Sequence, residues 1–288
     1  MYSSIWARGL RTARRWHRPL VLAWLLGGLA APQAAEERPA RIASLNLCTD
    51  QLVLMLVDRQ RIASLTVLAD RPESSYMAAL AEGIPGNQGL AEEVVPLAPD
   101  LVIATSFTDP VRLALLRRLG IRVERVDPPG RLDEVAAHLR EVAEMVGEQA
   151  RGEELVAAME ERLEALRSQA AARPPRRAAV YGPNGVTAGA GTMLDDLMTA
   201  AGLRNLAAEQ GVVGYRHLAL EQLLAWQPEV LVLEAAEATG GASLAHRPLQ
   251  HPALRALRQQ LVTVALPAPL ADCVGPMVVD ALALLVAA

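Results

Sequence analysis

The residues best suited to chemistry are aromatic side chains that stand near the ends of expected strands. Beyond residue 35 the chain has five aromatic residues, and four of them lie at or after such ends: Tyr76, Phe107, Tyr181 and Tyr215. Ligands of open parallel sheets lie beyond the carboxyl ends of the strands. Flat rings in these places would provide walls for a large, partly apolar ligand. The alternative is that the rings pack beneath loops.

Two arginines accompany these rings. Arg71 lies in the same long loop as Tyr76, and Arg216 follows Tyr215 in the glycine-flanked loop "GVVGYRH". A guanidinium in such a place can pair with a carboxylate or phosphate of a ligand. Each is equally consistent with a solvated surface position, because all 28 basic residues of the chain are arginine.

No group of residues forms a recognisable catalytic or metal-ligating motif. The chain has no G-x-S-x-G elbow, and Asp195 and Asp196 are neighbours on an expected helix, so their carboxylates point to different faces. His138 is expected on a helix surface. The histidines beyond residue 35 lack HxH or HExxH spacing: His138, His217, His246 and His251. We predict no enzyme, no bare-metal site and no cofactor. A two-lobe enzyme without a recognised motif is the alternative.

One short stretch of the sequence occurs twice in similar form. "LAEEVVPLAPDLVI" begins at Leu90, and "LALEQLLAWQPEVLV" begins at Leu218. Aligning their prolines pairs Glu92 with Glu221, and each copy predicts a helix, a proline stop and a buried strand. The second half of the chain is therefore expected to echo the first.

Short apolar runs alternate with helical patterns along most of the chain. Strands are expected at 41–46, 62–66, 100–105, 121–126, 178–182, 229–235 and 261–266. Helices are expected at 49–57, 109–120, 192–202, 251–260 and 276–288. Several of the strands are apolar throughout, which is typical of parallel sheets covered on both faces. The pattern predicts the α/β class.

A long helical stretch divides this alternation in two. The period is helical from Arg131 to Ala172, and "RPPRR" at 173–177 ends it because proline cannot continue a helix. We predict an N-terminal α/β lobe over 36–148, a linker helix over 149–172 and a C-terminal α/β lobe over 173–288.

The first 35 residues differ in composition from the rest. Five arginines and no acid are followed by the apolar run "LVLAWLLGGLAA", which is shorter than the roughly 20 residues needed to span a bilayer. This is typical of a secretory signal peptide. An uncleaved signal anchor is the alternative. Cleavage near Ala35 would leave 23 basic (28 − 5) and 32 acidic residues, a net charge of −9, in an exported chain without a basic face for nucleic acid.

These stretches together resemble a known family, the class III periplasmic substrate-binding proteins of ABC importers. The resemblance covers nearly all of the chain after residue 35. It rests on "RIASLNLCTDQLVLML", "GLAEEVVPLAPDLVIAT", the isolated long helix, "YGPNGVTAGAGTMLDDLMTAAGLRNLA" and "LALEQLLAWQPEVLVL".

The resemblance implies two Rossmann-like lobes with central parallel sheets, joined by one rigid helix, with a ligand cleft between them. It implies a periplasmic monomer, without stable membrane insertion, that delivers a metal chelate or corrinoid to an ABC permease dimer with its ATPase. Ferric siderophore, cobalamin and haem remain open as ligands. A sensor or chaperone that presents a ligand without an importer is the alternative function.

The resemblance also implies a role for the repeated glutamates. In this family one surface glutamate on each lobe docks onto arginines of the permease, and Glu92 and Glu221 occupy the matching positions. The alternative is that both are first-turn glutamates favoured by the helix dipole.

The chain has two cysteines, Cys48 and Cys273. Export to an oxidising compartment and an even count favour a disulfide. Each cysteine follows an expected strand and precedes a helix, one in each lobe, so a bond would tie the lobes together. Two free thiols lining the pocket are the alternative.

Overall fold

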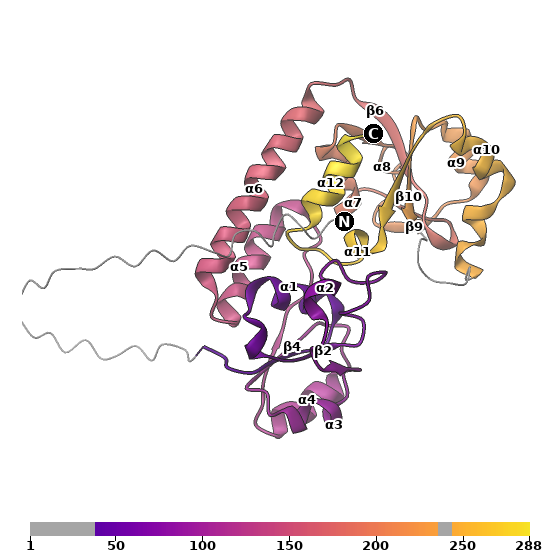
Figure 1. The fold of residues 1–288 in the computed structure, drawn as a ribbon. Helices are drawn as coiled ribbons and strands as arrows, with labels where there is room; N and C mark the ends of the chain where they lie inside the picture. The colour runs from indigo at the N-terminus through magenta and orange to yellow at the C-terminus, as the bar shows by residue number, and fades with distance from the viewer. Residues whose placement is uncertain (1–37, 236–243) are drawn as a thin grey trace, which may run out of the picture.

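The computed structural model describes residues 38–235 and 244–288, which form two α/β lobes beside one long helix (Figure 1). The predicted signal peptide over residues 1–35 lies outside the described residues. The fold class agrees with the prediction, because both lobes contain a parallel sheet with helices on its two faces.

The N-terminal lobe contains a five-stranded sheet in the order β3-β2-β1-β4-β5, and every pairing in it is parallel. Its strands are β1 Ile42–Ser44, β2 Ile62–Thr66, β3 Gly86–Asn87, β4 Leu101–Ala104 and β5 Arg122–Arg125. All residues of β1 and β4 are buried. This is what apolar runs without alternation predict for a sheet covered on both faces.

The C-terminal lobe contains a four-stranded parallel sheet in the order β11-β10-β6-β8. Its strands are β6 Arg176–Val180, β8 Leu203–Asn205, β10 Val230–Ala235 and β11 Val262–Pro267. A separate antiparallel pair is formed by β7 Val186–Ala188 and β9 Tyr215–His217.

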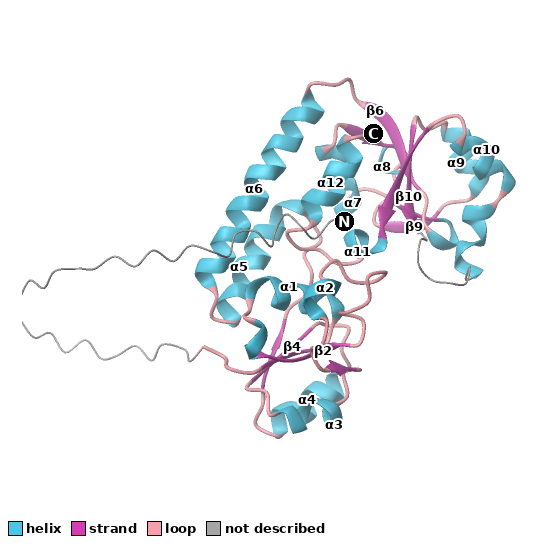
Figure 2. Ribbon diagram, viewed as in Figure 1, coloured by secondary structure: helices cyan, strands magenta, loops and turns pink. Residues whose placement is uncertain are grey.

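Helices cover both sheets on both faces (Figure 2). Those before the end of the long helix are α1 Leu47–Leu56, α2 Ala78–Ala81, α3 Ala91–Val94, α4 Pro110–Arg118, α5 Val135–Met145 and α6 Gln149–Ala171. Those after it are α7 Met193–Ala200, α8 Leu206–Glu209, α9 Leu220–Trp226, α10 Pro252–Arg258, α11 Ala268–Ala271 and α12 Val278–Val286.

The 23-residue helix α6 belongs to the cores of both lobes. Its first half places Leu155 and Val156 in the core of the N-terminal lobe, and its second half places Leu163 and Leu166 in that of the C-terminal lobe. Near its start, a Cβ on Gly152 would stand 2.4 Å from the Cβ of Ala143. The glycine therefore allows α5 to pack directly on α6, which holds the helix rigidly against the first lobe.

Several local features differ from the sequence-based expectation. The short strands β3, β7, β8 and β9 were not predicted, because two or three residues show no readable alternation. Tyr215 consequently lies in β9 rather than in a loop. His138, expected on a surface, is 8% exposed. Burial lowers the pKa of its imidazole, and the charge of Asp127 opposes this in part.

The two lobes are joined covalently. Cys48, in α1, and Cys273, just before α12, form a disulfide with their Cα atoms 5.0 Å apart. This is within the range that a disulfide spans without backbone movement. The predicted bond is therefore present, and it closes a sequence separation of 225 residues.

A buried polar cluster joins the lobes a second time. The hydroxyl of Tyr76, from the loop after β2, donates to Asp280 on α12. The other oxygen of the Asp280 carboxylate lies 2.5 Å from Arg162 Nη2 on α6. Asp280 is only 6% exposed, and these two partners take the place of the water that its carboxylate lacks. One carboxylate thus connects both lobes and the long helix.

We predict that the disulfide contributes strongly to stability. The Cys48→Ser/Cys273→Ser double variant should lose up to about 5 kcal/mol in free energy of unfolding, because the closed loop is long. Urea unfolding with and without reductant measures this, and reductant should leave the double variant unaffected. Thiol titration of the unfolded, unreduced wild-type protein should find no reactive thiol. Two reactive thiols before reduction would contradict the prediction.

Candidate functional site

The carboxyl ends of the two parallel sheets meet where the lobes join. Cys48 comes shortly after the end of β1, and Cys273 shortly after the end of β11. Because the strands of each sheet are parallel, the loops after β2 and β4 leave the same edge as the loop after β1. The disulfide therefore brings together the two edges at which open α/β sheets bind ligands.

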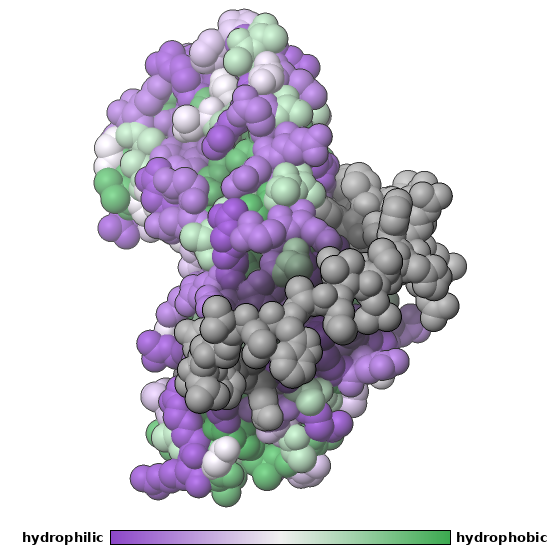
Figure 3. Space-filling model, turned by 90° about the vertical axis from the view of Figure 1, so that its left-hand side faces the viewer, coloured by the Kyte–Doolittle hydropathy of each residue, from purple (hydrophilic) through white to green (hydrophobic). Residues whose placement is uncertain are grey.

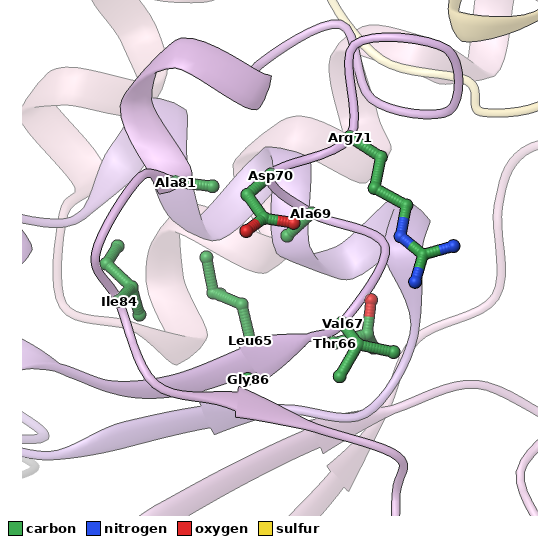
Figure 4. A pocket seen from close by; sticks show the side chains of 9 residues that line it. All are labelled: Leu65, Thr66, Val67, Ala69, Asp70, Arg71, Ala81, Ile84 and Gly86. Atoms are coloured by element: carbon green, nitrogen blue, oxygen red, sulfur yellow. The ribbon is translucent and has the colours of Figure 1, made fainter. Parts of the chain in front are cut away.

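A cavity of about 300 Å³ opens at the carboxyl end of β2 (Figure 4). It is lined by Leu65, Thr66, Val67, Ala69, Asp70, Arg71, Ala81, Ile84 and Gly86. Figure 4 shows the Arg71 side chain extending along one side of this group. Apolar side chains form the floor, and the charged groups of Asp70 and Arg71 are exposed. The cavity therefore combines buried apolar side chains with two exposed charged residues.

A buried carboxylate supports the wall of this cavity. Asp50 is fully buried, and its Oδ2 accepts hydrogen bonds from the backbone N (3.1 Å) and the hydroxyl (2.5 Å) of Thr66. Its Oδ1 has no hydrogen-bond partner among the residues that the structure describes. Burial raises the pKa of Asp50 to about 7, although the nearby Ser44 hydroxyl and the hydrogen bonds from Thr66 act in the opposite direction.

Buried polar side chains also tie the neighbouring strand ends to one another. The Asn87 amide nitrogen donates to the Ser44 carbonyl and to the Ser64 hydroxyl, at 3.0 Å each. The Ser44 and Thr49 hydroxyls are 2.7 Å apart. Sequence reasoning missed this network. Polar residues within or directly after apolar runs, where strands end, could have indicated it.

Two of the predicted aromatic side chains are available to a ligand. Phe107, after β4, is 82% exposed, and Tyr215, in β9, is 55% exposed. Arg216 is exposed next to Tyr215, and its Nη1 donates to the Tyr215 carbonyl at 3.2 Å. Each lobe therefore presents one ring and one arginine, since Arg71 borders the cavity of the N-terminal lobe.

The other two predicted aromatic side chains serve the fold. Tyr76 is partly buried, and its hydroxyl is engaged by Asp280. Tyr181 is 2% exposed and packs with Leu218, Leu223 and other residues in the core of the C-terminal lobe. Burial and, after it, the charge of Glu221 raise the pKa of the Tyr181 hydroxyl. Both tyrosines follow strands, but their rings turn into the protein.

The repeated stretch has the same hydrogen bonds in both lobes. Glu93 and Gln222, at the third position of α3 and α9, each accept from the backbone N of the residue before the helix. Ala98 and Gln227 both adopt the left-handed conformation, with φ of 45° and 49°. The capping bonds begin each helix, and the left-handed residue after it turns the chain toward the next strand.

The acids that follow the paired prolines also have equivalent roles. Asp100 accepts from the backbone N of Arg41 at 3.0 Å, just before β1. Glu229 accepts from the backbone N of Arg177 at 2.8 Å, within β6. Asp100 thus fixes the start of β4 beside β1, and Glu229 fixes the start of β10 beside β6.

Glu92 and Glu221 have no such structural role. Both are exposed in the first turn of their helices, α3 and α9. Neither carboxylate forms a hydrogen bond or ion pair with the residues at 38–235 and 244–288. The repeat therefore contains one matched pair of exposed acids without such a bond, both in the first turn of a helix.

The described part of the chain contains neither a metal cluster nor a membrane-spanning helix. No three His, Cys, Asp or Glu side chains there gather closely enough to hold a metal ion. None of the helices at 38–235 and 244–288 is both long and apolar enough to cross a bilayer.

Residues 42–258 match the model of a family described as periplasmic binding protein. The chain belongs to this family. The match covers both lobes and α6, and excludes the segment before β1 and the last elements from β11 onward. The proteins named below as similar are binding proteins rather than enzymes.

Among similar solved structures are two periplasmic haem-binding proteins. RhuT from Roseiflexus sp. RS-1 is 26% identical with a TM-score of 0.67, over 86% of this chain and 98% of that one. A haem-binding protein from Pseudomonas aeruginosa is 25% identical with a TM-score of 0.67, over 86% and 92% of the two chains.

A cobalamin-binding protein from Halobacterium salinarum is 27% identical over 201 residues. The alignment covers 68% of this chain and 54% of that protein, so the chain spans about half the length of this curated relative. The vitamin B12-binding protein BtuF of Vibrio cholerae, 22% identical with a TM-score of 0.60 over 87% and 96% of the two chains, shares the fold.

We predict that Asp50 makes the protein less stable as pH rises from about 4 to 7. Its folded-state pKa of about 7 lies above the ordinary aspartate value of 3.8, so the folded state binds the proton more tightly. The stabilisation is complete below about pH 4 and is lost as pH rises through the folded pKa, by roughly 2–4 kcal/mol. Urea unfolding across this range measures it.

Asp50→Asn should remove this part of the pH dependence and raise stability at pH 8, since the amide cannot ionise. The matched control is Asp58→Asn, because the Asp58 side chain is 83% exposed. If the Asp50→Asn variant keeps the wild-type pH profile of stability, Asp50 does not titrate as stated.

Proposed function

We propose that this chain is the periplasmic substrate-binding component of an ABC importer, which captures a metal chelate or corrinoid and delivers it to a membrane permease. Membership of the periplasmic binding protein family supports the binding role. The similar cobalamin-binding and haem-binding proteins support the ligand class. We also propose that residues 1–35 are a signal peptide, that the N-terminal lobe ends at residue 148 and that the C-terminal lobe begins at residue 173.

The ligand would lie between the carboxyl edges of the two sheets, with Phe107 and Tyr215 as aromatic walls. The observation that carries this proposal is the 82% exposure of Phe107, the most exposed of the large apolar side chains in the described residues. This phenyl ring is exposed to water directly after a buried strand. Covering it with a flat apolar surface would lower the free energy of the complex. Arg71 and Arg216 would pair with acidic groups on the ligand.

Glu92 and Glu221 are proposed as the permease contacts. The remaining acidic and capping positions of the repeat are explained by hydrogen bonds within each lobe. A two-fold permease dimer needs equivalent contacts from both lobes of a single-chain partner. Exposed carboxylates opposite arginines would set register and speed of docking more than affinity.

We predict tight binding of one member of a panel of cobalamins, haem and ferric siderophores. Quenching of Trp226, the one tryptophan after residue 35, reports the titration. Phe107→Ala and Tyr215→Ala should each weaken binding about tenfold, because each removes an exposed ring. Val262→Ala, a 38% exposed apolar side chain on β11, is the control and should bind as wild type. Binding of free zinc or an amino acid, with no binding of the panel, would refute the proposal.

We predict that Glu92→Arg/Glu221→Arg abolishes uptake through the permease and leaves the ligand dissociation constant unchanged. The control is Glu141→Arg/Glu161→Arg, which changes the net charge equally at exposed sites on α5 and α6. Uptake of labelled ligand into proteoliposomes containing the permease and ATPase separates delivery from binding. Normal uptake by the first variant would leave both residues as helix-start glutamates.

A further inference from the structure

The outward side of α4 carries a row of exposed apolar side chains. Val111, Leu115 and Leu119, the last of which directly follows α4, are spaced four residues apart and are 73%, 46% and 54% exposed. The core of the lobe does not need them, because Leu113 and Leu116 fill the inward side and are buried. A run of exposed apolar residues on one face of a helix is typical of an interaction surface.

The charges beside this row are positive. The sequence of α4, PVRLALLRR, contains three arginines and no acid. Arg112 Nε lies 3.8 Å from Asp109 Oδ2, so these two side chains form an ion pair. Arg118 lies on the same face as the row, is exposed and forms no ion pair with residues that the structure describes. Arg117 points away from the row and donates to the Val123 carbonyl of β5. The chain as a whole has a net charge of −4, so this helix is locally opposite in sign.

The corresponding helix of the second lobe lacks the apolar row. Between β10 and β11, α10 buries Leu254 and exposes Arg255, Ala256 and Arg258. The α/β architecture is built there without large exposed apolar side chains on the described residues of the helix. The row on α4 is therefore not a requirement of the fold.

We infer that the α4 ridge, defined as Val111, Leu115, Leu119 and Arg118, docks on an anionic lipid bilayer. Apolar side chains enter the boundary between headgroups and acyl chains, while guanidinium groups pair with lipid phosphates. The ridge is convex, since it stands on the outer side of a surface helix, and it suits a deformable planar partner. Figure 3 shows apolar residues at the lower end of the molecule, where Figure 1 places α3 and α4.

The ridge and the proposed permease contact lie at the same end of the lobe. The Arg112 guanidinium donates to the Gly89 carbonyl at 3.5 Å, two residues before α3, which carries Glu92. Lipid contact at the ridge would therefore turn Glu92 toward the membrane. The inference itself does not require an importer, because it depends only on the surface of α4.

Flotation with lipid vesicles tests this inference. The processed protein from the periplasm is mixed with phosphatidylethanolamine vesicles containing about 30 mol% phosphatidylglycerol, or with phosphatidylcholine vesicles, at about 0.05 M and about 0.5 M salt. Binding is expected to the anionic vesicles at low salt and to fall at high salt. Absence of binding to the anionic vesicles would overturn the inference.

Variants locate the contact. Leu115→Gln and Arg118→Gln should each reduce the bound fraction about fivefold. The matched control is Leu80→Gln on α2, because Leu80 is 47% exposed and Leu115 is 46% exposed. All three sites are on the surface, so the variants should fold, and Arg118→Gln tests the ridge independently of any apolar change. Equal binding of all variants to the anionic vesicles would refute the lipid assignment. So would variants that bind these vesicles as wild type and lose only their binding to the permease.

Discussion

The relative position of the two lobes is the constraint on which the site depends. Three connections fix it: the Cys48–Cys273 bond, the Asp280 carboxylate between Tyr76 and Arg162, and the helix α6, whose side chains enter both cores. A covalent bond, a buried charge with two partners and a shared hydrophobic core resist separation by different physical means. The two sheet edges are therefore held facing each other without a ligand.

This arrangement assigns different tasks to residues of the same type. Phe107 and Tyr215 remain exposed at the edges of the two lobes. Tyr76 and Tyr181 follow strands in the same way, yet one supports the lobe junction and the other packs inside its lobe. Position after a strand places a residue at the edge, whereas the partner of its hydroxyl and the space around its ring decide which way it faces.

Most of the matched residues in the internal repeat serve the fold of each lobe. Capping at Glu93 and Gln222, left-handed turns at Ala98 and Gln227, and strand-fixing acids at Asp100 and Glu229 recur with the same geometry. Subtracting these roles leaves Glu92 and Glu221 as the matched acids that we propose as contacts to a partner outside the chain. The α4 ridge adds an asymmetry, because only the first lobe carries it.

Periodicity and proline positions in the sequence determined the α/β class, the longer strands and the helix α6, since these depend on local patterns of several residues. The resemblance to periplasmic substrate-binding proteins, on the same stretches, indicated the family. The short strands β3, β7, β8 and β9, the burial of His138 and the Asp50 network were decided only by tertiary structure. Their signals are contacts between distant segments, such as Thr66 with Asp50 or Tyr76 with Asp280, and the packing of the whole chain sets those contacts.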